Sequence, residues 1–386
     1  MSYLMPNYLP LDVSFVKGDG CYLTDSSGEK YFDAISGIGV VNLGHCHKDI
    51  TKTIQDQASK LIHTSNWYHI NHQEELAEKL CKLANMDTAF FGNSGAEANE
   101  AAIKIARLYG NQKNIANPTI ITAKKSFHGR TMATLSATGN DKVQSGFSPL
   151  VSKFIHVEFD SVNEILNHTD NPDVVAVMLE PIQGESGVII PDSNYLNSVR
   201  DICNENDWLL ILDEVQSGIG RTGKLFAHQY NKITPDIMTL AKGLGNGMPI
   251  GACLAKGKAS SILVPGTHGS TFGGNPLACK TAITVLDIIE RDKILDNSVS
   301  MGEYILTAFK DNFSKSSSVI DIRSKGLMIG IELNIDCSNL LQKALENKLL
   351  INITGQTIRL LPPLIINKDD ANFLINKICK LVNNLQ

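Results

Sequence analysis

Residues 237–247 read IMTLAKGLGNG. The apolar run from Ile237 to Leu240 is typical of a buried strand, and the three glycines after Lys242 are typical of an open loop. This pattern places the Lys242 amine at the end of a strand and away from bulk water, where its pKa falls and it can attack a carbonyl carbon. A lone lysine at a strand end is more often an ordinary solvent-facing side chain, so the interpretation depends on the residues that accompany it.

Other apolar runs also end in polar clusters, and helical patterns separate them. Such runs are typical of a parallel sheet that is covered on both faces, and ligands bind beyond the carboxyl ends of its strands. The sequence therefore predicts that these clusters converge with Lys242. The runs are Ala89–Gly92, Ile120–Ala123, Val174–Leu179 and Trp208–Leu212, and the clusters are 94–96, 127–130, 183–185 and 213–216.

The two ends of the chain have shorter elements. Residues 11–35 alternate apolar runs with turn clusters and predict a small antiparallel meander. From residue 319 on, short strands and helices predict a second, smaller α/β lobe. The expected strands are Val319–Ile322, Leu327–Leu333, Leu349–Ile353 and Thr357–Leu361, and the expected helices are 338–348 and 370–384.

Bulk composition excludes several classes of protein. The 386 residues carry a net charge of -5 with no basic block, which argues against nucleic acid or an anionic membrane as a partner. We find no signal peptide and no apolar run near the ~20 residues that span a bilayer, and we expect a cytoplasmic protein. Neither the eight cysteines nor the pair His45 and His47 has the spacing of a metal site, so no metal is expected.

Two glycine motifs suggest nucleotide binding but lack the required context. Residues 218–224 fit Gly-x-x-x-x-Gly-Lys, but Leu225 stands where a magnesium-binding hydroxyl is needed. Residues 218–223 also fit Gly-x-Gly-x-x-Gly, but residues 213–217 separate this motif from the preceding strand. A non-catalytic nucleotide-binding or regulatory protein on a similar sheet remains an alternative from a different functional class.

The converging residues match the needs of pyridoxal 5′-phosphate. This cofactor requires a lysine amine, a buried acidic residue for its ring nitrogen and a site for its phosphate, and the start of a helix offers the last of these. Lys242, Asp213 and the turn at 93–100 supply these groups, and Phe127 could stack on the ring. Arginines would bind the carboxylates of an amino acid and a 2-oxo acid.

A series of motifs along nearly the whole chain resembles the class III aminotransferases of the fold-type I pyridoxal-phosphate enzymes. The motifs are NSGAEANE (93–100), SFHGRT (126–131), EPIQGE (180–185), LDEVQ (212–216), AKG (241–243) and STFGGNP (270–276). The resemblance implies an α/β fold whose large cofactor-binding domain, residues 51–284, has a mostly parallel seven-stranded sheet. It also implies a smaller α/β domain that is built from residues 1–50 and 285–386.

The resemblance assigns cofactor roles to particular residues. Lys242 links covalently to the cofactor and moves the proton, and Asp213 holds the pyridine nitrogen. Ser94, Gly95 and Ala96 bind the phosphate, and Phe127 stacks on the ring. Gln216 lies near the ring hydroxyl. Thr271 binds the phosphate of the neighbouring subunit's cofactor, which implies a homodimer with shared active sites.

The resemblance also implies a reaction. It predicts transfer of the δ-amino group of N2-acetyl-L-ornithine to 2-oxoglutarate, with Arg130 and Ser270 on the donor. Arg359 binds the acceptor's α-carboxylate, and Glu185 pairs with Arg359 when that carboxylate is absent. Ornithine, succinyl-diaminopimelate and 4-aminobutyrate are alternative donors, although residues 37–42 contain no acidic group to pair with a free α-amine.

Two positions depart from the family pattern. Ser186 stands where a second glycine is expected, and Gly39 stands where alanine is more usual. Gly39 lies in a loop that is expected to border the donor pocket. The motifs therefore predict the type of reaction more directly than they predict the donor.

Overall fold

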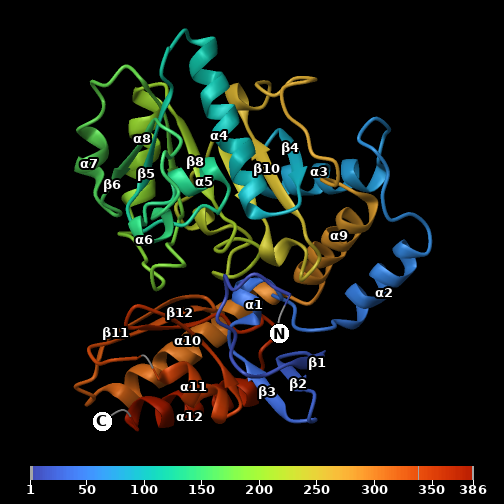
Figure 1. Cartoon of the computed structure of the whole chain (residues 1–386), viewed down its shortest axis with the longest axis vertical. Helices are drawn as coiled ribbons and strands as arrows, with labels where there is room; N and C mark the ends of the chain where they lie inside the picture. Colours follow the sequence, from blue (N-terminus) through green and yellow to red (C-terminus); the bar gives the residue numbers. More distant parts are fainter. Residues whose placement is uncertain (1–2, 338, 385–386) are drawn as a thin grey trace.

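A seven-stranded sheet forms the centre of the larger part of the molecule (Figure 1). The structure is a computed structural model that describes residues 3–337 and 339–384. The sheet has the order β4-β10-β9-β8-β7-β5-β6, and all neighbours are parallel except β10, which runs antiparallel to β4 and β9. Its strands are β4 (Thr88–Gly92), β5 (Thr119–Ala123), β6 (Phe154–Val157), β7 (Val174–Leu179), β8 (Leu209–Asp213), β9 (Ile237–Leu240) and β10 (Gly251–Ala255). The predicted mostly parallel sheet is therefore confirmed.

Both faces of this sheet are covered, as its apolar strands predict. In β8, Leu209 and Ile211 pack into the core beneath α4 (Gly95–Gln112), whereas Leu210 and Leu212 pack beneath α8 (Tyr195–Glu205). Successive side chains of a strand point to opposite faces, so a strand between two helical layers must be apolar throughout. The other helices and turns of this part are α2 (Lys48–Ala58), α3 (Asn71–Ala84), α5 (Met132–Ala137), α6 (Asp141–Gln144), α7 (Val162–Leu166), α9 (Pro276–Arg291), η1 (Ala227–Tyr230), η2 (Lys242–Leu244) and η3 (Gly257–Ala259).

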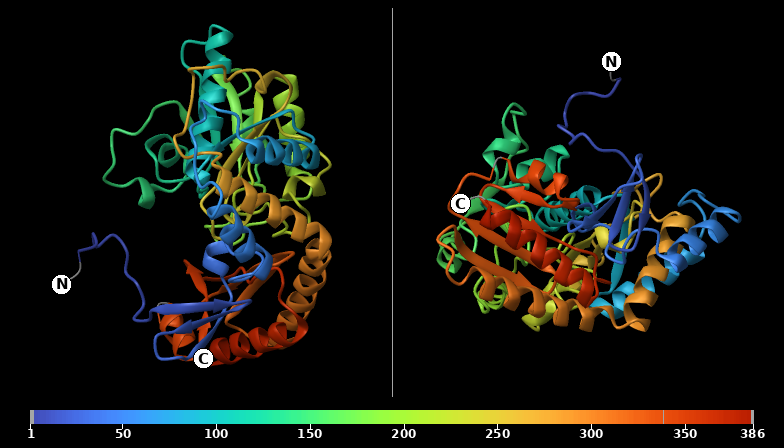
Figure 2. Two further views of the ribbon diagram at one scale, coloured as in Figure 1. Left: turned by 90° about the vertical axis from the view of Figure 1, so that its right-hand side faces the viewer. Right: turned by 90° about the horizontal axis from the view of Figure 1, so that it is seen from below.

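The two ends of the chain lie together below this sheet, where the blue and red segments of Figure 1 meet. One four-stranded sheet has the order β1-β2-β3-β13, and the other has the order β11-β12-β15-β14. The strands are β1 (Phe15–Asp19), β2 (Tyr22–Asp25), β3 (Lys30–Asp33), β11 (Val319–Lys325), β12 (Met328–Leu333), β13 (Leu349–Leu350), β14 (Asn352–Thr354) and β15 (Thr357–Leu360). The helices are α1 (Ser36–Gly39), α10 (Ile294–Phe313), α11 (Leu340–Glu346) and α12 (Lys368–Asn383). In Figure 2 the segment before β1 extends away from the body of the molecule.

The predicted meander at residues 11–35 is confirmed, whereas the single strand predicted at Leu349–Ile353 is wrong. The chain pairs first with β3 through β13 and then with β15 through β14, so Ile351 marks the passage from one sheet to the other. The helix expected at 338–348 is observed from Leu340, and residue 338 lies outside the described residues. Among the helices that the structure describes, none is both long and apolar enough to cross a membrane.

Arg221 joins three distant segments inside the molecule. Its fully buried guanidinium donates to the carbonyls of Leu327 (3.1 Å) and Pro362 (2.5 Å) and to Asn42 Oδ1 (2.7 Å). Burial lowers the Arg221 pKa to about 9, against the raising effect of Asp33. The cost of burying this charge is therefore offset by neutral oxygens rather than by a carboxylate in direct contact.

Removing this guanidinium should weaken the whole fold. We expect Arg221→Ala to lower the free energy of unfolding by about 3–5 kcal/mol, because several buried oxygens lose their donor. Chemical denaturation of the variant measures the change. Arg291→Ala is the matched control, because Arg291 is 55% exposed and should leave the unfolding midpoint nearly unchanged. Equal midpoints for the two variants would contradict the stabilising role of Arg221.

Candidate active site

A cavity of about 440 Å³ lies beyond the carboxyl ends of β7, β8 and β9. Most of the residues that the sequence singled out line it, although they come from segments far apart in the chain. Residues predicted from the sequence that line the cavity are Ser94, Gly95, Ala96, Phe127, Arg130, Glu185, Asp213, Gln216 and Lys242. The expected convergence of the strand-end clusters is therefore confirmed.

Lys242 is positioned by the end of β9. The strand ends at Leu240, and Lys242 opens the turn η2 with a φ of 44°. Burial lowers the pKa of the Lys242 amine, and Arg359 adds to this effect, whereas the nearby carboxylates, first among them Glu185, oppose it. A buried amine that loses its proton more easily than usual is suited to nucleophilic attack and to proton transfer.

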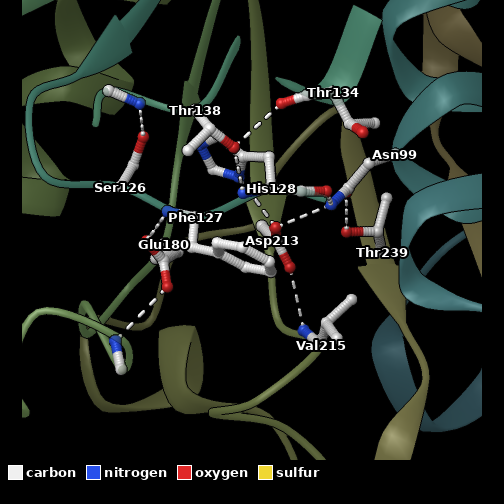
Figure 3. Close-up of polar contacts among 12 residues, drawn as sticks. Asn99, Ser126, Phe127, His128, Thr134, Thr138, Glu180, Asp213, Val215 and Thr239 are labelled. Carbon is white, nitrogen blue, oxygen red and sulfur yellow. Dashed lines mark hydrogen bonds and ion pairs between the residues drawn. The ribbon is translucent and has the colours of Figure 1, made fainter. Parts of the chain in front are cut away.

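Asp213 is held by a network of buried hydrogen bonds at the end of β8 (Figure 3). Its Oδ2 accepts from Asn99 Nδ2 (2.7 Å) and lies 2.8 Å from His128 Nδ1, and its Oδ1 accepts from the Val215 amide (3.0 Å). Thr239 in turn donates to Asn99 Oδ1 (2.7 Å), which fixes the orientation of that amide. The network leaves the carboxylate rigid and in contact with the cavity.

His128 supplies the charge that balances Asp213. Burial acts to lower the His128 pKa, but the hydrogen bond and charge of Asp213, together with the charge of Glu180, outweigh it and raise that pKa. A protonated His128 donates a charge-assisted hydrogen bond to Asp213 Oδ2. An ionised carboxylate in this position can hold a protonated ring nitrogen.

The start of α4 offers a site for an anion. Ser94 caps the helix by accepting from the Glu97 amide (3.2 Å), and the amides of the first turn, from Gly95 on, belong to an 18-residue helix. A Cβ at Gly95 would lie 2.7 Å from Val215 Cγ1, so glycine is needed for this close approach. The helix dipole and these free amides favour a phosphate group.

Arg359 and Glu185 form an ion pair at another wall of the cavity. The guanidinium lies 2.9 Å from Glu185 Oε1, and its second nitrogen donates to Glu185 Oε2 (3.1 Å). Gln216 Nε2 also donates to Glu185 (3.0 Å), and Asn352 Oδ1 accepts from Arg359 Nε (3.0 Å). Burial acts to raise the Glu185 pKa, but the charge and hydrogen bond of Arg359 lower it overall. The pair expected from the sequence is therefore present.

The predicted residues that do not line this cavity are Arg359, Ser270 and Thr271, although Arg359 pairs with Glu185, which does line it. Ser270 and Thr271 line a neighbouring hollow, where Ser270 Oγ accepts from Asn93 Nδ2 (3.2 Å) and the Gly273 amide (3.0 Å). Within one copy of the chain, neither residue contacts the space beside Lys242.

The two histidines without a metal spacing have structural roles. His45 Nε2 lies 2.7 Å from Asp33 Oδ2, and His47 caps α2 by accepting from the Asp49 amide (3.3 Å).

The structure also shows the surroundings of the two residues that depart from the family pattern. Ser186 donates to the Lys125 carbonyl, and Gly39 has a φ of 73°, where alanine would be strained.

His128, Asn99 and Glu180 lie within the motifs at 126–131, 93–100 and 180–185, but the sequence predicted no role for them. Asn99 lies four residues after Gly95, so helical spacing alone places it on the same face of α4 as the anion site. His128 and Glu180 directly follow a predicted aromatic and a predicted strand, but their contacts depend on how the strands are arranged in the sheet. The position of Asn99 near the anion site could therefore be predicted from the sequence. The contacts of His128 and Glu180 could be identified only from the folded structure.

Comparisons with known proteins agree with this site. The family model "Aminotransferase class-III" matches residues 3–382. The chain is 52% identical over 386 residues to the acetylornithine aminotransferase of Nitrosomonas europaea, covering 99% of this chain and 98% of that protein. The solved ornithine aminotransferase of Toxoplasma gondii has a TM-score of 0.96 at 31% identity and covers 99% of this chain and 93% of that one. The acetylornithine aminotransferase of Elizabethkingia anophelis has a TM-score of 0.88 at 33% identity, with coverages of 99% and 96%.

These matches extend over the whole chain rather than over a shared core. The seven-stranded, mostly parallel sheet and its solved neighbours agree with the α/β architecture of fold-type I pyridoxal-phosphate transferases. The alternative of a non-catalytic nucleotide-binding protein is therefore set aside. The chain belongs to the class III aminotransferases, and it is a transaminase.

Proposed function

We propose that this transaminase moves the δ-amino group of N2-acetyl-L-ornithine to 2-oxoglutarate, giving N-acetyl-L-glutamate 5-semialdehyde and L-glutamate for arginine biosynthesis. The observation that carries the proposal is the Arg359–Glu185 ion pair beside Lys242 and Asp213. An arginine that is neutralised by a movable carboxylate can serve two substrates in turn, one with and one without a carboxylate at that point. Full-length similarity to acetylornithine aminotransferases supports the choice of donor.

The residues present fit pyridoxal 5′-phosphate as the cofactor. The Asp213 carboxylate and the first residues of α4, Gly95 and Ala96, line the same cavity, so a protonated ring nitrogen and a phosphate each have a complementary group there. Asp213 would hold the ring nitrogen, Phe127 would cover the ring, Lys242 would link to the cofactor, and Ser94, Gly95 and Ala96 would bind the phosphate. When bound, the cofactor draws electrons away from the bonds of the amino-bearing carbon.

The side chains of this chain then have distinct tasks. Lys242 Nζ would remove the proton from the amino-bearing carbon of the donor in one half of the ping-pong cycle and deliver a proton to the carbon that becomes amino-bearing in the other half. Arg130 would bind the α-carboxylate of acetylornithine, and Ser270, which lies outside the cavity of its own chain, would contact acetylornithine in the site of the neighbouring subunit. Arg359 binds the α-carboxylate of 2-oxoglutarate once Glu185 moves aside.

A homodimer with shared active sites completes the proposal. Thr271 would bind the phosphate of the neighbouring subunit's cofactor, which accounts for its position outside the cavity of its own chain. Exposed aromatic side chains near this loop support an interface there, because Trp67 is 91% and Phe272 is 61% exposed. We also propose a cytoplasmic location and a large domain of residues 51–284 with a small domain of residues 1–50 and 285–386.

Other ω-amine donors are the competing proposals within the family, and the solved ornithine aminotransferase of Toxoplasma gondii gives one of them weight. Val40 lines the cavity, and residues 37–42 have no acidic side chain to pair with the free α-amine of ornithine. An acylated donor needs no such partner, so the pocket favours acetylornithine.

Donor profiling tests this proposal. Glutamate release from 2-oxoglutarate should be fastest with acetylornithine, with kcat/KM at least about tenfold above that for ornithine, succinyl-diaminopimelate or 4-aminobutyrate. The preparation should also have a visible absorption band that borohydride removes. A higher kcat/KM for one of the other donors would contradict the proposed donor, and a colourless chain that binds no added cofactor would contradict the cofactor.

A further inference from the structure

Glu180 holds two separate walls of the cavity but has no assigned role. It follows β7 directly, lines the cavity and is 7% exposed. Its Oε2 accepts from the Phe127 amide (3.0 Å), as Figure 3 shows, and its Oε1 accepts from the Gly184 amide (3.3 Å). Among the described residues, no cation lies within ion-pair distance of Glu180. The carboxylate is therefore used as a clamp for two backbone segments.

Each of these segments carries a side chain of the proposed site. The first carries the Phe127 ring, and the second places Glu185 next to Gly184, where Glu185 meets Arg359. A Cβ at Gly184 would lie 1.9 Å from Gln216 Oε1, so this turn has almost no freedom to shift toward Gln216. A substitution of Glu180 would therefore affect both the wall that carries Phe127 and the wall that carries Glu185.

We propose that Glu180 is a positioning residue whose ionised carboxylate keeps Phe127 and the Gly184–Glu185 turn in place against the bound cofactor. The proposal rests on the proposed function of the site. An ionised carboxylate offers acceptors to both amides, whereas a protonated carboxyl has one oxygen that donates. Because an amide N–H cannot accept, protonation of Glu180 loosens one of its two contacts.

This clamp should respond to pH near neutrality. Burial raises the Glu180 pKa to about 7, with Asp213 adding to the effect and His128 and the two amide contacts opposing it. The charged groups that face Glu180 are His128, Asp213 and the Lys242 amine. The charge of Glu180 in turn acts to raise the pKa of the Lys242 amine. As the pH rises from 6 to 8, Glu180 ionises and the clamp tightens. Loss of the proton from His128 would act in the opposite direction, because the positive charge of His128 lowers the Glu180 pKa.

The test is the rate at which the full-length chain, loaded with pyridoxamine 5′-phosphate, releases that compound at pH 6 and pH 8. Pyridoxamine 5′-phosphate has no aldehyde, so the titration of Lys242 cannot act through a covalent link. Release from the unaltered chain should be about tenfold faster at pH 6 than at pH 8, as expected when a charge-assisted contact is lost. Glu180→Gln should release the compound fast at both pH values, because its amide supplies only one acceptor oxygen.

Control variants separate this role from general destabilisation. Glu290→Gln makes the same exchange at an exposed carboxylate on α9 and should keep the full response to pH. Glu180→Asp keeps the charge with a shorter reach, so it should release faster overall but still respond to pH. If Glu180→Gln does not fold, Glu180→Asp carries the test at pH 8, where its shorter carboxylate cannot reach both amides and release should be faster than from the unaltered chain. Equal release rates at pH 8 would contradict the role of Glu180. Circular dichroism checks the fold of each variant.

The outcomes distinguish this inference from the proposed function. A chain that does not bind pyridoxamine 5′-phosphate at either pH contradicts the proposed cofactor. Binding with the same response to pH in the unaltered chain and in Glu180→Gln contradicts the role of Glu180 alone, because the response then belongs to the phosphate of the ligand or to another residue.

Discussion

Lys242→Ala is expected to abolish transamination, with a loss in kcat of at least about 10⁴-fold, because covalent attachment and proton transfer both depend on one amine. The fold should survive. Among the described residues, the Lys242 amine has no hydrogen-bond or ion-pair partner, so alanine leaves no protein group unsatisfied. Removal of a buried amine also relieves its cost of burial, which is the cause of the lowered pKa.

Glutamate release from acetylornithine and 2-oxoglutarate measures the loss, and circular dichroism with thermal unfolding measures the fold. The absorption band of the covalent link should be absent from Lys242→Ala, and borohydride should attach no cofactor to this variant, because a free aldehyde is reduced without forming a bond to the chain. Lys310→Ala is the matched control, because Lys310 is exposed on α10 and should keep both activity and the band. Near-full turnover by Lys242→Ala would show that another group moves the proton.

Strands buried on both faces were predictable to within one residue, because their apolar runs have sharp ends: β5 begins one residue before the predicted strand, and β8 lies one residue later than predicted. β7 (Val174–Leu179) and β9 (Ile237–Leu240) have the predicted bounds, and each of their residues is buried. β10 (Gly251–Ala255) was missed because its sequence, GACLA, has weak strand propensity. Its glycine serves a different purpose, since a Cβ at Gly251 would lie 2.1 Å from the Ser94 carbonyl oxygen at the start of α4. Pairing with β4 and β9 on both sides makes this segment a strand.

Some residues of the candidate site could likewise be predicted from the sequence, whereas others could not. Residues at strand ends, such as Lys242 and Asp213, could be predicted because the carboxyl ends of parallel strands meet at one edge. The pairing of Glu185 with Arg359 joins residues 174 positions apart, and only the resemblance to a family could suggest it. The clamp at Glu180 depends on backbone amides, which carry no signature in the sequence. Motifs therefore identified the reactive groups, whereas the groups that position them required the structure.

Asp213→Asn should have the second-largest effect, a loss in kcat of roughly 10²- to 10³-fold, typical of removing one preorganised electrostatic contact. The amide has the same shape and can still accept from Val215 through one oxygen, so the fold should remain. What disappears is the negative charge that raises the His128 pKa and that would hold a proton on the ring nitrogen of the cofactor.

The loss should fall on kcat in both half-reactions, whereas KM for acetylornithine and 2-oxoglutarate should change little, because Asp213 contacts neither carboxylate arginine. Single-turnover kinetics with each substrate measures this, and the visible spectrum should shift even though the covalent link through Lys242 remains. Asp201→Asn, at an exposed position on α8, is the matched control and should change neither rate nor spectrum. A loss confined to one half-reaction would mean that Asp213 acts on a substrate rather than on the ring, since a contact with the cofactor ring must affect both halves of a ping-pong cycle.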